Sequence, residues 1–372
     1  MLHYVTLKKS LILDILQQYH NQPPSNEIFF PRKLEIPEDN RINIYGPRGS
    51  GKTALILDYI LEYNIDEVIY IDFLDPNIRF NQISPIKLQK FILDNSINLL
   101  IMDNYNSDLD INFDINKIII ISRMDLKLDK YTSIKLFLLD YEEFLVFEKG
   151  VNTSTNFNHF LKLGTLPIKG HSIKNNILTL KSFFEHKFTY QEQSVLIILA
   201  IYQTKRLSIN QLYLHSKERF KISKDWFYAK IKEFKKEGII YFFDDIYQKG
   251  GKKMILFDFA FGRYLAIGQP FITQFDTMVA ISLIKHNIEF KTLGIYGYIT
   301  KNGELITPAP FESEESIFKK SYSKFSLYKK YNIQKITILT VTNQYYYHIG
   351  DIAFEAIPFY EWTILDNCLK EL

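Results

Sequence analysis

The sequence predicts an α/β protein in which a parallel sheet is followed by a winged helix-turn-helix and a small C-terminal α/β domain. Three observations lead to this prediction. Between residues 41 and 140, short apolar strands alternate with helical stretches. A glycine-rich loop at residues 46–53 joins the first strand to the first of these helices. Residues 189–260 then combine three helical patterns with a hairpin.

The composition sets limits on the class of protein. A chain of 372 residues that is 47% hydrophobic and 23% charged can bury the cores of two or three domains. Its net charge of +3 is too small to indicate nucleic-acid binding by itself. The single cysteine, Cys368, excludes an internal disulfide framework and a cysteine-based zinc site. Residues 1–9 lack a signal-peptide pattern and every apolar run is shorter than a bilayer, so we expect a soluble cytoplasmic protein without a membrane partner.

The N-terminal part reads as an amphipathic helix at 6–19 and then a parallel sheet. The expected strands are 41–45, 68–73, 99–103, 117–122 and 135–139. Their continuous β-branched runs are typical of a sheet that is buried on both faces. Helices at 52–63 and 85–95 complete the strand–helix–strand units.

The loop matches the pattern G-x-x-x-x-G-K-[ST], which predicts a P-loop NTPase sheet. Its residues are Gly46, Pro47, Arg48, Gly49, Ser50, Gly51, Lys52 and Thr53. Backbone N–H groups in such a loop, together with the helix N-terminus behind it, point at one phosphate chain. Lys52 supplies a charge for the β- and γ-phosphates, and the Thr53 hydroxyl is a magnesium ligand. We therefore expect ATP and Mg²⁺ as cofactors.

Acidic and polar residues follow the later strands. The strand at 99–103 ends in Asp103, which we expect in the magnesium shell. The next residue, Asn104, can hydrogen-bond a water but cannot take its proton at neutral pH. Asp108 or Asp110 could substitute as a base, although nothing in the sequence positions either of them. Arg123 follows the strand at 117–122, where it is either a γ-phosphate sensor or a solvated charge.

The central part is helical and basic. Expected helices at 190–203, 208–219 and 223–237, with a hairpin of 239–243 and 254–257, form the winged helix. Residues 215–237 contain eight cations and four acids. Helical periodicity makes Lys232 and Lys236 the better phosphate candidates, with Lys252 and Lys253 beside them in the wing. The alternatives are a solvated helix face or a protein-interaction module.

The C-terminal part mixes helices and strands. Helices are expected at 274–286 and 313–331. Strands are expected at 288–299, 304–307, 335–342 and 345–348. This pattern predicts a small α/β domain with a central sheet.

The order of these parts resembles the archaeal and bacterial AAA+-like ATPases that join a P-loop module to a winged helix and a restriction-endonuclease-like domain. The matching stretches are Gly46–Thr53, 70–76, 99–104, 118–123, 138–145 and 160–167. The resemblance implies ATP, Mg²⁺ and possible contact with double-stranded DNA. The residue patterns predict domains at 1–150 (P-loop, with the N-terminal helix), 151–188 (helical connector), 189–260 (winged helix) and 261–372, and the resemblance implies that the last of these is a degenerate nuclease-like domain.

Three departures from that family affect the predicted function. Asn104 stands where the family usually has a catalytic glutamate, no clear arginine finger follows Arg123, and the expected nuclease hairpin lacks its acid and Glu-x-Lys. Glu289-Phe290-Lys291 has the spacing but no partner acid, so we expect no nuclease activity. The sequence thus predicts a weak or switch-like ATPase. The alternative is a non-hydrolysing, nucleotide-dependent scaffold or DNA-binding regulator.

Overall fold

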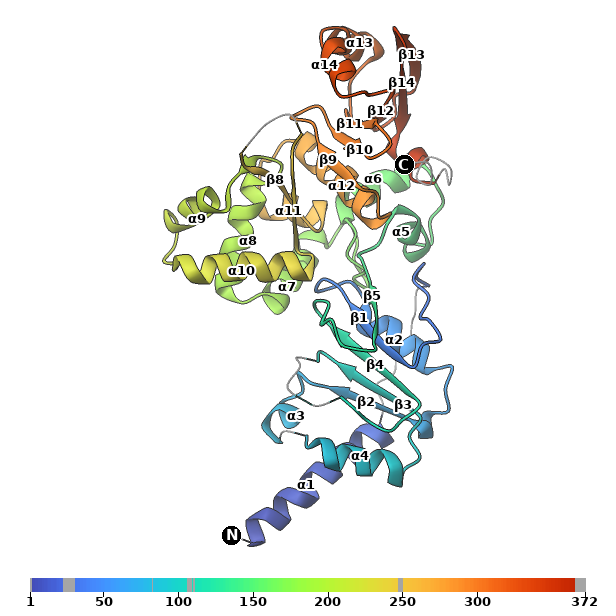
Figure 1. Ribbon diagram of the computed structural model, residues 1–372, viewed down its shortest axis with the longest axis vertical. Coiled ribbons are helices and arrows are strands. Elements are labelled where there is room, and N and C mark those ends of the chain that lie inside the picture. The colour runs from blue at the N-terminus through green and yellow to red at the C-terminus, as the bar shows by residue number, and fades with distance from the viewer. Residues whose placement is uncertain are drawn as a thin grey trace. The chain divides into compact units, whose positions relative to one another are not determined.

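The computed structural model describes residues 2–22, 31–81, 83–105, 109, 111–246 and 250–364, with the side chains of residues 2–11 left out. Asp108, Asp110 and Cys368 lie outside the described residues. The chain divides into two compact units, Met1–Phe137 and Leu138–Leu372, and each is described by itself (Figure 1). The predicted P-loop domain extends to residue 150, whereas the first unit ends at Phe137, before the helix at Tyr141–Phe147.

The first unit is built on a five-stranded parallel sheet, as predicted for a P-loop NTPase. Its strands are β1 (Arg41–Tyr45), β2 (Val68–Asp72), β3 (Leu99–Asp103), β4 (Lys117–Ser122) and β5 (Thr132–Lys135). Their order is β2-β3-β4-β1-β5, so β4 separates the strand before the glycine-rich loop from the strand that ends in Asp103.

The last strand of this sheet differs from the prediction. It covers 132–135 rather than 135–139, and it pairs with β1 up to Lys135. The Leu136 N–H makes one more bond, to the Tyr45 carbonyl, before the chain leaves the sheet. Leu136, Leu138 and Leu139 are buried without being in a strand. The apolar run therefore reflected burial, not strand pairing.

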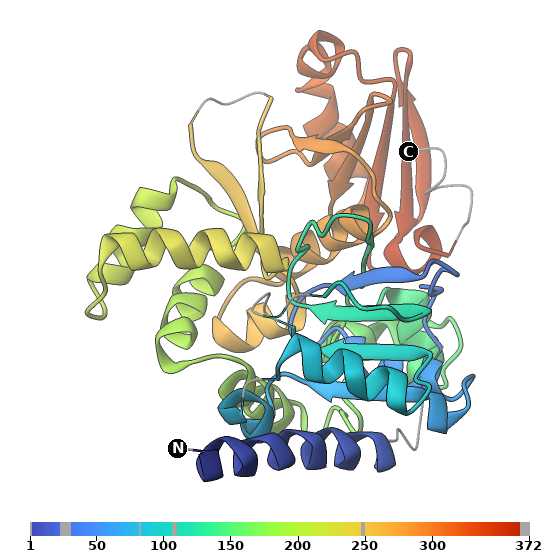
Figure 2. The same ribbon diagram turned by 60° about the horizontal axis from the view of Figure 1, so that its bottom comes forward.

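Helices cover both faces of this sheet (Figure 2). Its helices are α1 (Leu2–Asn21), α2 (Lys52–Ile60), α3 (Pro76–Asn81) and α4 (Pro85–Asp94). Ile56 and Ile60 of α2 pack on one face of the sheet. Leu16 of α1, Ile78 of α3 and Leu88 of α4 pack on the other face. The result is a three-layer arrangement with the strands buried on both sides.

The second unit begins with helices and a winged-helix pattern of elements. Three helices lead into it: α5 (Tyr141–Phe147), α6 (Ser154–Leu163) and α7 (Asn176–Lys187). The winged-helix pattern itself comprises α8 (Tyr190–Tyr202), β6 (Arg206–Leu207), α9 (Ile209–Lys217), α10 (Lys224–Glu237), β7 (Ile240–Phe243) and β8 (Lys252–Leu256). Its sheet has the order β6-β8-β7 and is antiparallel. One face of α10 packs in the core through Phe227, Ile231 and Phe234.

A mixed sheet of six strands completes the second unit. The helices of this last part are α11 (Phe259–Leu265), α12 (Phe271–Lys285), α13 (Glu314–Tyr322), α14 (Phe325–Lys330) and α15 (Phe359–Trp362). Its strands are β9 (Phe290–Thr292), β10 (Tyr298–Thr300), β11 (Glu304–Pro308), β12 (Lys335–Thr340), β13 (Tyr345–Ile349) and β14 (Ile352–Pro358). The order is β13-β14-β12-β11-β10-β9, so a further sheet follows the P-loop sheet as predicted.

Two predicted elements of this sheet region are each divided. The strand expected at 288–299 is the antiparallel pair β9 and β10, because the chain reverses at Gly294–Gly297. A Cβ on Gly297 would lie 2.1 Å from the Ile306 carbonyl oxygen, so only glycine fits there. The helix expected at 313–331 is likewise two helices, α13 and α14.

None of the helices described is both long enough and apolar enough to cross a lipid bilayer.

Candidate nucleotide-binding site

The glycine-rich loop follows β1 and leads directly into α2, which begins at Lys52. A Cβ on Gly46 would lie 2.1 Å from the Leu136 carbonyl oxygen, so the loop can pass the end of β5 only with glycine at this position. Gly51 caps α2 with a φ of 89°, a left-handed conformation that favours glycine. The strand–loop–helix context that the motif requires is therefore present.

The Lys52 ammonium lies over its own loop. Its Nζ donates to the carbonyl oxygens of Gly46 and Pro47, at 2.8 and 2.9 Å. The Ser50 hydroxyl oxygen is 3.4 Å away. These contacts hold a positive charge at the mouth of the loop, where the phosphates of a nucleotide would lie.

Thr53 and Asp103 meet although they are fifty positions apart in the chain. The Thr53 hydroxyl donates to Oδ2 of Asp103 at 2.7 Å. Asp103 is only 2% exposed, at the end of β3. A hydroxyl and a carboxylate side by side are oxygen donors of the kind that magnesium prefers. The two predicted magnesium ligands thus lie together.

Tyr70, in β2, contacts the same carboxylate and was not predicted. Its hydroxyl donates to Oδ2 of Asp103 at 2.6 Å. Burial, and then the charge of Asp103, raise the pKa of Tyr70 above its usual range. Tyr70 therefore stays a neutral donor at physiological pH. Its position inside an apolar strand gave no sign of this contact, which depends on the pairing of β2 with β3.

The Asn104 side chain contacts the end of β2. Its φ of 55° lies in the left-handed region, where asparagine is better tolerated than most residues. Its backbone N–H donates to Oδ1 of Asp103 at 2.7 Å. Its side-chain amide donates to Oδ1 of Asp72 at 2.9 Å.

The end of β4 is polar, but Arg123 is exposed. Ser122 is buried; its hydroxyl donates to the Met124 carbonyl oxygen and accepts a 2.9 Å bond from the Asn43 amide. Among the described residues, Arg123 has no hydrogen bond or ion pair. Its role as a sensor stays a prediction.

Arg32 joins the loop to the end of the sheet and was also not predicted. One guanidinium nitrogen donates to the Ser50 carbonyl oxygen and the other to that of Phe137, each at 2.8 Å. Arg48, within the loop, is buried. An isolated arginine before β1 carries no motif, so the sequence could not reveal this contact.

The cations expected to contact nucleic acid fall into two groups. Lys232 and Lys236 of α10 are exposed. The side chain of Lys252 in β8 is 51% exposed and pairs with Asp244 at 2.8 Å. An exposed pair of this kind is weak, so Lys252 remains accessible to another anion.

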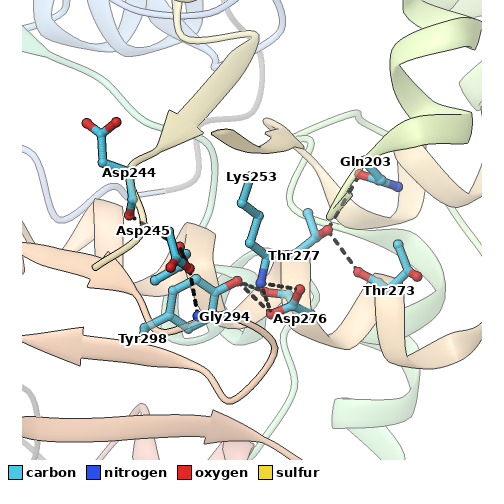
Figure 3. A network of polar contacts seen from close by, with 10 residues as sticks. Gln203, Asp244, Asp245, Lys253, Thr273, Asp276, Thr277, Gly294 and Tyr298 are labelled. Carbon is cyan, nitrogen blue, oxygen red and sulfur yellow. Dashed lines mark hydrogen bonds and ion pairs between the residues drawn. The ribbon is translucent and has the colours of Figure 1, made fainter. Parts of the chain in front are cut away.

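Lys253 lies in a different environment from these three lysines. It is 8% exposed, and its ammonium lies 2.6 Å from an Asp276 carboxylate oxygen and over the Tyr298 ring (Figure 3). The Tyr298 hydroxyl donates to the same carboxylate at 2.6 Å. This burial argues against a role for Lys253 in binding phosphate. Lys252 and Lys253 differ in this way because neighbouring residues of a strand face opposite sides of its sheet.

The Glu-x-Lys sequence at 289–291 is at the surface. The Glu289 side chain is 80% exposed and lies 3.8 Å from the Lys301 ammonium. Within the part of the chain that the structure describes, no group of three or more histidine, cysteine or acidic side chains could hold a metal ion.

No protein-family model matches the sequence, and no curated protein matches it. The comparison with solved structures finds a chain in a structure of the Drosophila ORC bound to AT-rich DNA and Cdc6. It is 15% identical, with 68% of this chain and 91% of that chain covered, at a TM-score of 0.18. A TM-score this low establishes no shared fold. The assignment of the site therefore depends on its own geometry.

Proposed function

We propose that this protein binds Mg·ATP at the 46–53 loop. The observation that carries the proposal is the 2.7 Å contact between the Thr53 hydroxyl and the Asp103 carboxylate. It brings the hydroxyl of a phosphate-binding loop to the acid at the end of another parallel strand. That pairing is what P-loop NTPases use to hold magnesium beside the phosphates.

Thr53 and Asp103 would hold the magnesium ion. An ion held there would supply positive charge that neutralises the phosphates of the nucleotide. Lys52 would orient the phosphate chain with its ammonium, while the loop N–H groups would donate hydrogen bonds to the phosphate oxygens. Tyr70 would keep the Asp103 carboxylate in place by its hydrogen bond.

Turnover is proposed to be slow or switch-like. The residue directly after Asp103 is Asn104, and an amide cannot accept the proton of an attacking water. The alternative is a scaffold that binds the nucleotide without hydrolysing it. Asn104 favours the alternative, whereas Lys52, Thr53 and Asp103 are compatible with both.

The second unit would supply the partner contact. The exposed Lys232 and Lys236 of α10 and the half-exposed Lys252 of β8 are cations that suit the phosphates of double-stranded DNA. A protein partner with an acidic surface would fit the same lysines. Salt dependence and competition between duplex DNA and an acidic polypeptide separate these two partners.

One sample can test the nucleotide proposal. Calorimetry with ATP and magnesium should show saturable binding that weakens when EDTA removes the metal. Asp103→Asn should lower the magnesium-dependent part of the affinity, because it removes the charged ligand. Steady-state phosphate release on the same protein, with and without duplex DNA, distinguishes an ATPase from a scaffold. Equal affinity with and without magnesium would contradict the proposed site.

A further inference from the structure

A carboxylate lies directly beside Asn104, on the neighbouring strand. Asp72 ends β2 as Asp103 ends β3, and these two residues are opposite each other in the strand register. The Asn104 amide nitrogen is 2.9 Å from Oδ1 of Asp72. The pair joins an acid and an amide at the carboxyl edge of the sheet, next to the 46–53 loop's own contact with Asp103.

The two acids at this edge differ in how much of their hydrogen-bonding capacity is used. Oδ2 of Asp103 accepts from Thr53 and Tyr70, and its Oδ1 accepts from the Asn104 N–H. Oδ1 of Asp72 accepts from Leu74 and Asn104. Within the described residues no hydrogen bond uses Oδ2 of Asp72, and the side chain is half-buried rather than enclosed. Asp72 thus has an oxygen left for a water.

The backbone at Asn104 explains why its side chain reaches β2. A φ of 55° turns the residue out of the strand, and its N–H is fixed by Asp103. Asparagine tolerates this conformation better than glutamate, and its amide can donate to a carboxylate, which a glutamate cannot do when ionised. An amide at 104 therefore donates a hydrogen bond to Asp72, whereas a carboxylate at 104 could offer it no donor.

We propose that Asp72 is the general base for ATP hydrolysis and that Asn104 is the positioning residue that holds it. This inference rests on the proposed binding of Mg·ATP. A water on Oδ2 of Asp72 gives one proton to the carboxylate while its oxygen bonds to the γ-phosphorus. The bond from that phosphorus to the bridging oxygen breaks, and its electron pair leaves with ADP. Asp72 then releases the proton to solvent.

Exchanging the two side chains tests the proposal. Asp72→Asn is nearly isosteric and keeps a hydrogen-bonding pair, so it should leave the Kd for Mg·ATP unchanged. It should lower kcat by about 10²- to 10⁴-fold, the usual contribution of a general base. The double variant Asp72→Asn with Asn104→Asp returns one carboxylate to the pair and should recover part of kcat. Asp66→Asn, an exposed acid before β2, is the control with the same charge change.

Asn104→Ala separates positioning from folding. It removes the amide that holds Asp72, so kcat should fall while the Kd for Mg·ATP, measured by calorimetry, stays the same. A change in Kd alone would indicate a merely structural role and overturn the positioning assignment.

The remaining outcomes also decide. If Asp72→Asn turns over ATP at the parent rate, Asp72 is not the base. If the parent binds Mg·ATP but releases no phosphate, Asp72 is again excluded, and nucleotide binding stands by itself. If the parent does not bind Mg·ATP, the proposed function itself fails. If Asp72→Asn loses ATP binding, the double variant Asp72→Asn with Asn104→Asp replaces it in the test. Phosphate release by that double variant would support a carboxylate base in the pair, and binding without release would count against it.

Discussion

Lys52→Ala is the sharpest test of the phosphate loop. In the structure, the ammonium donates to two carbonyl oxygens of its own loop and lies 3.4 Å from the Ser50 hydroxyl. Lys52 is half-buried, so water can replace it as a donor to the Gly46 and Pro47 carbonyls when the side chain is removed. The variant should therefore fold normally and lose mainly its interaction with the phosphates.

The size of the effect follows from the bond that is lost. A hydrogen bond to a charged group contributes about 1.5–3 kcal/mol. At about 1.4 kcal/mol per tenfold, Mg·ATP should bind roughly 10- to 150-fold more weakly. Calorimetry measures this directly. Lys90→Ala is a matched control, because it removes the same charge from α4, whose apolar side chains pack on the other face of the sheet from α2.

Two results would refute the reasoning about Lys52. One is an unchanged Kd for Mg·ATP in the Lys52→Ala variant, because the ammonium would then make no contact with the phosphates. The other is an equal loss of affinity in Lys90→Ala, because net charge and not the loop would then set the binding. A lowered unfolding temperature of Lys52→Ala would instead show that the loop contacts stabilise the fold.

Three further predictions concern the second unit. Replacing Lys232 and Lys236 by Ala should flatten the slope of log K against log salt for duplex DNA by roughly 1.8, at about 0.9 per phosphate contact; anisotropy over a salt series measures it, and an unchanged slope counts against α10. Supercoiled plasmid should stay intact with Mg²⁺ or Mn²⁺, and nicking that disappears in Glu289→Ala would contradict this. Gly164→Ala should lower the free energy of unfolding by about 1–3 kcal/mol, because its φ of 81° and ψ of −156° lie in a region essentially limited to glycine. The added Cβ would also lie 2.6 Å from an Asp258 oxygen. Thermal unfolding measures the loss, and Gly268→Ala, whose Cβ meets nothing within 4 Å, should show a smaller one.

The parts of the nucleotide site that the sequence predicted are local. The 46–53 loop is one continuous motif, and Asp103 ends an apolar strand at a plausible distance downstream. The loop motif and the acid at the end of a strand can both be recognised without knowing which strands pair. The order β2-β3-β4-β1-β5 is a different kind of fact, because it depends on the whole sheet. Tyr70 and Asp72 meet Asp103 and Asn104 only through the pairing of β2 with β3, so the sequence could not predict these contacts, although the stretch 70–76 was part of the family resemblance.

The prediction for the wing missed a signal that was present. Lys252 and Lys253 are consecutive residues of one strand, and strand residues alternate between the two faces. They could not both face one phosphate backbone. In the structure Lys252 points to solvent with Asp244, whereas Lys253 is buried with Asp276. Alternation alone could have separated them, although it could not have said which one is buried.

The buried ion pairs of the wing strands β6 and β8 limit which lysines of the winged helix can bind a partner. Lys253 of β8 pairs with Asp276 of α12, and Arg206 of β6 pairs with Asp245 at 2.5 Å. Asp245 in turn accepts bonds from Thr292 and the Gly294 N–H. These pairs join β8 to α12 and, through Asp245, β6 to β9, and removing one partner of a buried pair typically costs about 3–5 kcal/mol. The wing is therefore partly a structural element, and the cations left for a partner are those of α10 together with Lys252. A salt slope that responds to Lys232 and Lys236 but not to Lys252 would place the partner on the helix alone.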